Sequence, residues 1–218
     1  MRDAESMAEG YSRGLADSVG ENVIFCHDDI ELLEEDAASS LDVALQELDL
    51  VGIAGTDWLC GPKWIDAGPP HLFGQVAYPS VNGFTACIYG APAPHLGGMQ
   101  ALDGALLAWR RSAILQIGWD CERFDGFHFY DLDSSFRAFQ AGMRVGIACN
   151  LGFLHQSSGT YDEKWRIYAD RFLEKHASSL LPTPAILRSQ YAQAEVRTKV
   201  AVAKIMRPKF WTFESDAT

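Results

Sequence analysis

Val23-Ile24-Phe25-Cys26-His27-Asp28-Asp29-Ile30 places an unbroken apolar run directly before one histidine and two carboxylates. Short apolar runs of this kind are typical of a strand that is buried on both faces, as in a parallel sheet. Ligands of open α/β sheets bind at the carboxyl ends of the strands, where His27, Asp28 and Asp29 stand. Adjacent carboxylates are costly to bury without a cation, and their oxygens suit Mg²⁺ or Mn²⁺. The stretch therefore favours a metal and diphosphate site, with a solvated acidic turn as the alternative.

The composition is that of one globular domain, with room for an appendage. The chain has 218 residues, is 48% hydrophobic and carries a formal net charge of -11. This acidic balance argues against a general nucleic-acid binder, although a bound metal would still allow an anionic metabolite to bind. The five cysteines are scattered without a CxxC pair, which favours buried free thiols in a reducing compartment. The sequence shows neither an apolar signal core nor a run of about 18 apolar residues, so we expect a cytoplasmic protein without a transmembrane segment.

Apolar spacing along the chain predicts alternating helices and strands. Met7, Tyr11 and Leu15 predict an amphipathic helix over 3–17 that leads into the strand at 23–26. The same reasoning gives helices at 37–48, 110–118, 131–142, 162–176 and 185–205, and strands at 50–55, 102–109 and 144–148. This order predicts an α/β fold in which residues 1–180 form one domain and residues 181–218 form a C-terminal helix and tail.

Residues 56–94 are rich in glycine, proline and aromatic side chains. Such a composition predicts an irregular region with short strands. Loops of this kind often line binding surfaces, and aromatic faces stack well on sugars or bases. For any single aromatic residue in the region, burial in the core is an equally good interpretation.

Three motifs follow one another along the chain: His27-Asp28-Asp29, then Tyr130-Asp131-Leu132-Asp133 with Arg137 and Ala141-Gly142, and then residues 154–159. In this order and spacing they resemble the DXD motif, the EDxD…R…AG segment and the H.S.G segment of the inverting family 2 glycosyltransferases, which have the GT-A fold. Histidine replaces the first aspartate of the DXD motif, and Tyr130 replaces the usual glutamate. The resemblance covers about residues 5–176. It implies a truncated, Rossmann-like mixed sheet flanked by helices, with a C-terminal helical extension.

The resemblance implies a metal-dependent glycosyl transfer. Asp131 would be the catalytic base that deprotonates the acceptor hydroxyl, although a helix N-cap is its simpler interpretation. Asp29 and His155, together with His27, would hold Mn²⁺ or Mg²⁺ against the donor diphosphate. A histidine that follows an apolar strand is more often a structural hydrogen-bonding group.

The remaining candidates would bind the two substrates. Asp28, Asp29 and Asp103 are candidates for the donor, with a turn role beside Gly104 as the alternative for Asp103. Trp58, His128 and Asp133 are candidates for the acceptor. The expected partners are therefore a nucleotide-sugar donor and a glycan or another hydroxyl acceptor.

Members of the resembled family have earlier strands that bind the base and ribose, and the chain begins after them. We therefore expect an incomplete donor site and a strand at 23–26 that stands at a sheet edge. An exposed apolar edge favours a homodimer, unless the terminal helices cover it. Two other functions stay open. One is a non-catalytic nucleotide- or sugar-binding relative; the other is a metallo-hydrolase using His27, Asp29, His128 and His155, although the chain lacks an HExxH pairing.

Overall fold

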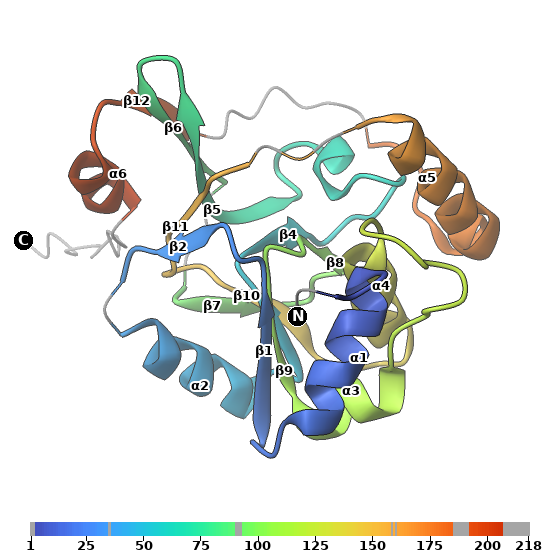
Figure 1. Ribbon diagram of the computed structural model, residues 1–218. Coiled ribbons are helices and arrows are strands. Elements are labelled where there is room, and N and C mark those ends of the chain that lie inside the picture. The colour runs from blue at the N-terminus through green and yellow to red at the C-terminus, as the bar shows by residue number, and fades with distance from the viewer. Residues whose placement is uncertain are drawn as a thin grey trace, which may run out of the picture.

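The computed structural model describes residues 3–34, 36–89, 93–157, 159, 161–184 and 192–206. These residues form two mixed sheets flanked by helices (Figure 1). The first sheet has the order β1 (Asn22–Cys26), β9 (Leu106–Arg110), β3 (Leu50–Gly52), β10 (Val145–Ala148) and β7 (His95–Gly97). Only its β3 and β10 strands pair in parallel; the other neighbours are antiparallel. The arrangement confirms the α/β class and the mixed, GT-A-like sheet architecture, whereas the parallel sheet expected around residues 23–26 was wrong.

The second sheet contains the longest strands. Its order is β12 (Ala192–Val196), β6 (Gly83–Ile88), β5 (Leu72–Ser80), β11 (Phe153–His155) and β2 (Ile30–Leu32); β4 (Ala54–Thr56) pairs with β5, and β8 (Ala101–Leu102) pairs with β4. β5 and β6 form a hairpin, so the expected irregular region contains nine- and six-residue strands rather than short ones only. In Figure 1 this hairpin projects from the upper left of the molecule, next to β12.

β1 lies at the end of the first sheet and is buried on one face only. Val23 and Phe25 are buried, whereas the side chain of Ile24 is 47% exposed. The prediction of burial on both faces was wrong, because only the inner face of β1 packs against other elements, helix α1 (Met7–Asp17) among them. Among the strands that the structure describes, β1 pairs with β9 only. The terminal position agrees with the expected sheet edge.

The helices lie close to where apolar spacing predicts them. α1 begins at Met7 rather than at residue 3, because the hydroxyl of Ser6 accepts a hydrogen bond from the Glu9 N–H and caps the helix there. The other helices are α2 (Ala37–Glu47), α3 (Arg111–Ile117), α4 (Tyr130–Gln140), α5 (Glu163–His176) and α6 (Lys199–Met206), with short 3₁₀ turns η1 (Trp64–Ala67) and η2 (Ala177–Ser179).

Three predicted elements differ from the structure. The strand expected at 50–55 is divided into β3 and β4, which belong to different sheets, and the one at 102–109 is divided by the Asp103-Gly104 turn into β8 and β9. The helix expected at 185–205 was wrong over 192–196, where β12 pairs with residues 84–88 of β6. Sheet pairing outweighs local propensity in that segment. Residues 185–191 and the tail from 207 lie outside the described residues.

The two sheets bring the polar ends of β1 and β11 together. β2 runs antiparallel to β11 with Ile30 opposite His155, and the Gln156 N–H donates to the Asp29 carbonyl at 2.9 Å. The His27 N–H donates to the Ala105 carbonyl at 3.0 Å, which fixes the turn after β1 against the turn before β9. These backbone contacts set the floor of a cleft.

Candidate active site

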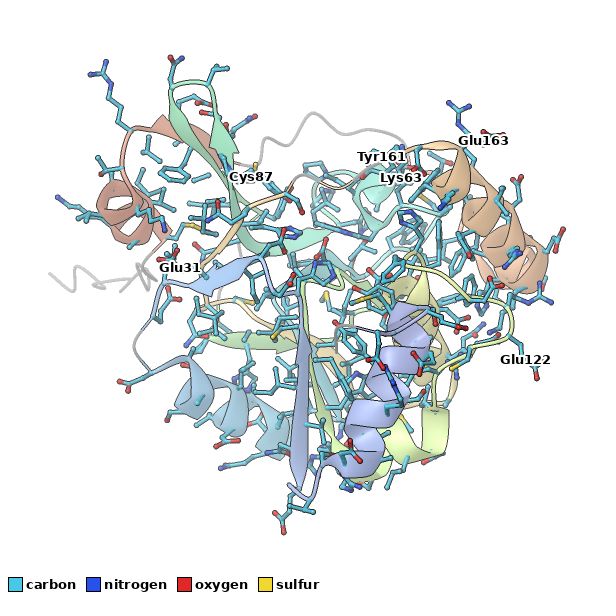
Figure 2. The ribbon with its side chains drawn as sticks, viewed as in Figure 1. Glu31, Lys63, Cys87, Glu122, Tyr161 and Glu163 are labelled. Carbon is cyan, nitrogen blue, oxygen red and sulfur yellow. The ribbon has the colours of Figure 1, made fainter. Side chains whose placement is uncertain are left out.

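One cleft of about 190 Å³ collects polar residues from four distant segments. Its lining includes His27 after β1, the Asp103-Gly104 turn, residues 127–132 at the start of α4, and His155 at the end of β11. The far wall is formed by Pro62, Lys63, Trp64, Ile65, Gly159, Tyr161 and Trp165. Figure 2 shows Lys63 and Tyr161 together near Glu163, at the start of α5.

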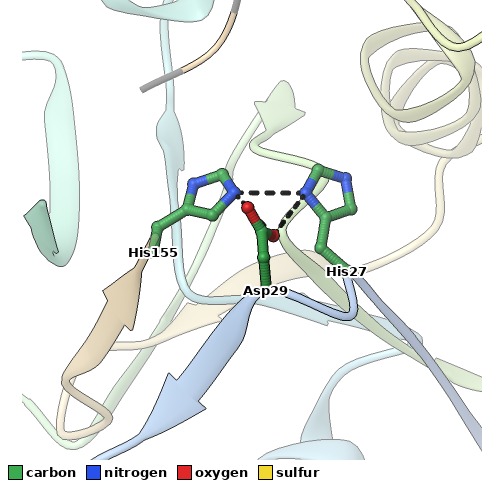
Figure 3. A group of neighbouring side chains, drawn as sticks. All are labelled: His27, Asp29 and His155. Carbon is green, nitrogen blue, oxygen red and sulfur yellow. Dashed lines mark hydrogen bonds and ion pairs between the residues drawn. The ribbon is translucent and has the colours of Figure 1, made fainter. Parts of the chain in front are cut away.

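His27, Asp29 and His155 present a metal-ligand group at this cleft (Figure 3). One ligand atom from each lies within 4.8 Å of the other two. The His155 Nε2 atom lies 3.3 Å from the Asp29 Oδ1 atom and 3.3 Å from the His27 Nδ1 atom. Two imidazoles and one carboxylate with open positions form a donor set that suits a divalent transition metal such as Mn²⁺. The residues therefore fit the metal that the resemblance implies.

The protonation of this group also suits a cation. Burial lowers the pKa of His27, which keeps its imidazole neutral and a lone pair available. Burial alone would raise the pKa of Asp29, but the Ser157 hydrogen bond and the two imidazoles lower it overall. Ser157 also lies 3.3 Å from the Nε2 atom of His155. The neighbouring Ser158, part of the motif noted in the sequence, lies outside the described residues.

Asp131 lines the cleft without an ion-pair partner among the described residues. Burial and the nearby charge of Asp103 raise its pKa to about 7, and backbone hydrogen bonds from Leu132 and Gly104 offset only part of that rise. A carboxyl group that titrates near neutral pH is suited to general base catalysis. Its interpretation as an N-cap was wrong, because the capping position of α4 is Phe129.

Phe129 holds an unusual backbone conformation for a bulky residue, with φ at 66°. The left-handed region costs a non-glycine residue roughly 1–2 kcal/mol. Phe129 is buried, and its ring packs on those of Phe124, Trp165 and Phe172 at centroid distances of 6.3, 5.4 and 5.5 Å. This aromatic packing compensates the backbone strain, and the turn starts α4 so that Tyr130 and Asp131 line the cleft.

Asp103 has the turn role that its position beside Gly104 suggested. Its Oδ1 atom accepts the Ala105 N–H at 2.9 Å, and its Oδ2 atom accepts the indole N–H of Trp64 at 3.2 Å. The same carboxylate lines the cleft, so its role in donor binding stays a prediction.

Aromatic side chains cover the outer part of the cleft. Phe127 and Tyr161 are 58% and 56% exposed. The Lys63 ammonium lies 4.3 Å from the ring centroid of Tyr161 and 5.1 Å from that of Trp165. His128 also lines this part, with its Nε2 atom 3.9 Å from the Asp162 carboxylate, and it is not in the metal-ligand group. Exposed rings beside a carboxyl group form a surface that suits a sugar.

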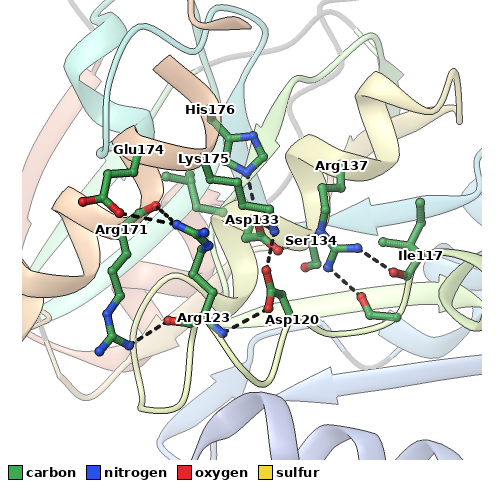
Figure 4. A network of polar contacts seen from close by, with 12 residues as sticks. Ile117, Asp120, Arg123, Asp133, Ser134, Arg137, Arg171, Glu174, Lys175 and His176 are labelled. Atoms are coloured by element: carbon green, nitrogen blue, oxygen red, sulfur yellow. Dashed lines mark hydrogen bonds and ion pairs between the residues drawn. The ribbon is translucent and has the colours of Figure 1, made fainter. Parts of the chain in front are cut away.

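Two candidate acceptor residues lie away from the cleft. The indole N–H of Trp58 donates to the Pro182 carbonyl at 2.8 Å, and its ring packs on His71 at 5.0 Å. Asp133 is buried at the centre of an ion network with Arg137, Lys175 and His176 (Figure 4). Asp28 is exposed and does not belong to the metal-ligand group.

The sequence did not indicate several residues of the site. Lys63, Tyr161 and Trp165 meet only through the packing of α5 against the loop before η1, and no spacing in the chain predicts it. Tyr130 stood out in the sequence as the residue in the place of the family's glutamate, and the structure places its hydroxyl 2.5 Å from the Nε2 atom of His27. The replacement of the family's glutamate by Tyr130 was therefore the feature of the sequence that could have indicated its role in the site.

A larger and more open hollow of about 820 Å³ lies at the other end of β1. It contains Arg110, whose guanidinium already donates to the carbonyls of Leu45, Gln46 and Leu48. No metal-ligand group is found there among the residues that the structure describes. The smaller cleft is therefore the better candidate for chemistry.

Comparisons with known proteins agree with the motifs. The model of a family described as "Glycosyltransferase like family" matches residues 1–179. A protein of Fuscovulum blasticum named "ATP synthase subunits region ORF 6" is 25% identical over 164 residues, which cover 72% of this chain. The match spans 60% of the length of that relative. Within the described ranges, no helix is both long enough and apolar enough to cross a membrane.

Proposed function

Since the chain belongs to this glycosyltransferase-like family, we propose that it transfers a sugar from a nucleotide-sugar donor to an acceptor hydroxyl, with inversion and with a divalent metal ion. The observation that carries the proposal is the placement of Asp131 in one cleft with His27 and His155, with a raised pKa and without an ion-pair partner among the described residues. A base and a metal-ligand group in one cleft are the two parts that this reaction needs.

Asp131 is the proposed catalytic base. Its carboxylate takes the proton of the acceptor hydroxyl as that oxygen forms a bond to the anomeric carbon. The bond from the anomeric carbon to the diphosphate oxygen breaks at the same time, and the nucleoside diphosphate leaves with the electron pair. Attack from the face opposite the leaving group inverts the anomeric configuration. A single displacement of this kind needs one base and no protein nucleophile.

The metal ion would be held by His27, Asp29 and His155. When bound, it supplies positive charge that stabilises the charge developing on the leaving diphosphate. Asp103 lies at the same cleft and is available to orient the donor sugar. The exposed rings of Phe127 and Tyr161 are a surface on which an acceptor sugar can stack beside Asp131.

A donor screen tests the transferase itself. The protein is incubated with UDP-, GDP- and dTDP-linked hexoses, Mn²⁺ and a mixture of glycan acceptors, and the glycoside formed is identified by mass spectrometry and NMR. We expect an inverted product whose formation requires Mn²⁺ and is lost in Asp131→Asn. Asp17→Asn, an exposed change at the end of α1, is the matched control and should remain active. Donor hydrolysis without transfer would favour a hydrolase instead.

A titration tests the metal site separately. Mn²⁺ is added to wild type, Asp29→Ala and Asp28→Ala, with and without UDP. We expect binding by wild type and by Asp28→Ala, the exposed neighbour, and a loss of at least about tenfold in affinity for Asp29→Ala. Equal binding by wild type and Asp29→Ala would remove Asp29 from the site. Metal and nucleotide binding without turnover of any donor would favour a non-catalytic binding relative.

A homodimer through the edge of β1 is part of the same proposal. The exposed side chain of Ile24 and the exposed Cys26 lie on this terminal strand, and an unpaired apolar edge is a surface that proteins usually cover. A two-fold axis would let the β1 strands of two copies meet. Light scattering over a range of concentrations tests it, and a monomer of 24.1 kDa at high concentration would contradict it.

A further inference from the structure

His27 and Tyr130 are in close contact inside the cleft. The Tyr130 hydroxyl lies 2.5 Å from the His27 Nε2 atom. The other ring nitrogen, Nδ1, faces the rest of the metal-ligand group, 3.3 Å from the His155 Nε2 atom and 3.9 Å from the Asp29 Oδ1 atom. The His27 imidazole therefore directs its Nδ1 atom at the metal-ligand group and uses its Nε2 atom for a hydrogen bond with the Tyr130 hydroxyl.

The chemistry of a neutral imidazole fixes what that contact must do when a metal is bound. A neutral imidazole carries one N–H, so Nδ1 can give its lone pair to a metal only if the proton is on Nε2. The Tyr130 oxygen is then the acceptor of that Nε2–H. Its own O–H can donate to the Gly104 carbonyl at 3.3 Å, which leaves the phenol oxygen free to accept. The chain His27, Tyr130, Gly104 is consistent in donors and acceptors.

Tyr130 is held rigidly enough to impose this arrangement. It is the first residue of α4 and is 5% exposed. The ring of Tyr11 meets it edge-on at 5.4 Å. A Cβ atom at Gly104 would lie 2.5 Å from the Tyr130 hydroxyl, so only glycine at that position leaves room for the phenol.

We infer that Tyr130 is a positioning residue, which holds His27 in the Nε2–H tautomer and directs its Nδ1 atom at the metal ion. The inference rests on the metal site of the proposed function. Partners of this kind behind a metal-ligating histidine raise the metal affinity about 10- to 100-fold.

The test measures Mn²⁺ affinity rather than turnover. Tyr130→Phe removes the hydroxyl and keeps the ring, and we expect the Mn²⁺ affinity in the presence of UDP to fall about 10- to 100-fold. The thermal unfolding of the metal-free variant shows whether its fold is kept. Tyr161→Phe, the exposed tyrosine of the same cleft, is the control and should bind within twofold of wild type. Equal affinities of wild type and Tyr130→Phe would overturn the inference.

Two further measurements separate positioning from a general structural effect. In a His27→Asp background there is no imidazole to orient, so adding Tyr130→Phe should change the Mn²⁺ affinity less than twofold. An equal loss in both backgrounds would overturn the inference. Imidazole ¹⁵N NMR of Mg²⁺-loaded wild type should show the Nε2–H tautomer at His27, and the Nδ1–H tautomer would contradict it. Wild type that binds no Mn²⁺ would contradict the metal site itself and the inference with it.

Discussion

Asp131 and Asp133 lie two positions apart in the first turn of α4, yet their surroundings are opposite. Asp131 faces the cleft, where burial and the charge of Asp103 raise its pKa to about 7. Asp133 is 1% exposed on the other side of the helix. Its burial would raise its pKa, but a hydrogen bond with His176 and the positive charges of Arg137 and Lys175 lower the pKa overall. Residues i and i+2 do not share a helix face, so one turn can serve both purposes. The neutralised carboxylate stabilises the fold, and the unpaired one is available for chemistry.

The largest effect that would test this comparison is a loss of stability in Asp133→Asn. The change leaves the Arg137 guanidinium beside a buried amide without an opposite charge, and it leaves Lys175 with its other partner, Asp120. Breaking such a buried pair costs roughly 3 kcal/mol or more. Urea unfolding at pH 7 measures the free energy, with Asp131→Asn as the matched control on the same turn. A loss below about 1 kcal/mol would mean that the network of Figure 4 contributes little to the fold.

Asp131→Asn should show the reverse pattern. The amide keeps the shape of the side chain but cannot accept the acceptor's proton, so transferase activity should fall by a factor on the order of 10² or more. Its far-UV circular dichroism should match that of wild type. Initial rates with the donor identified by the screen measure the effect. A fully active Asn variant would contradict the assignment of Asp131 as the base, and with it the functional difference between Asp131 and Asp133.

The pH dependence of turnover sharpens the same point. Asp131 acts as a base only when ionised, and its pKa is about 7. We therefore expect kcat/KM to fall about tenfold for each pH unit below that value and to level off above it. Rates from pH 5.5 to 8.5 at saturating Mn²⁺ give the profile, and a flat profile over this range would contradict the assignment.

The smallest expected effect is a pair of opposite pH slopes in stability. The folded-state pKa of Asp131 lies above its ordinary value of 3.8, so the stability it contributes is present below that value and is lost as pH rises towards 7. The free energy of unfolding of Asp131→Asn should therefore exceed that of wild type by about 1 kcal/mol or more at pH 8, and by less towards pH 4. The pKa of Asp133 is lowered, so its contribution is present above about pH 4 and fades as pH falls further. Urea titrations across pH 3–8 should show both slopes, and parallel slopes would contradict them.

Much of the arrangement could be predicted from the sequence. Local apolar spacing located α2, α3, α4 and α5, since each is an amphipathic segment with its own boundary residues. The motifs at His27, Asp29, Asp131 and His155 named residues that the fold brings to one cleft or its floor. The local patterns of the chain do not show that these motifs meet. The resemblance to the family implies it, because in that fold the motifs stand at neighbouring strand ends.

The remainder depended on tertiary contacts. Asp133 has Arg137 four positions later on the same helix, a local signal that Asp131 lacks, but its burial in an ion network depends on α5, which brings Lys175 and His176. β12 is a strand because β6 offers it an edge to pair with over residues 84–88. The Trp58 ring could be expected to stack on a ligand, but its indole N–H donates to the Pro182 carbonyl, which lies more than a hundred positions away in the chain. Such contacts follow from the packing of elements, which local patterns do not specify.

The metal-ligand group has one consequence for how the protein is made. His27 and His155 are 128 positions apart, and they meet only because β2 pairs with β11. Contacts of such long range close large loops and form late in folding. On the ribosome, the acidic turn after β1 emerges long before its second histidine, so no ion can be held there until most of the chain has been synthesised. Ion binding would then stabilise the β2–β11 pairing only after most of the chain has folded. Removing the ion with a chelator should weaken this pairing before the other strand pairs of the protein.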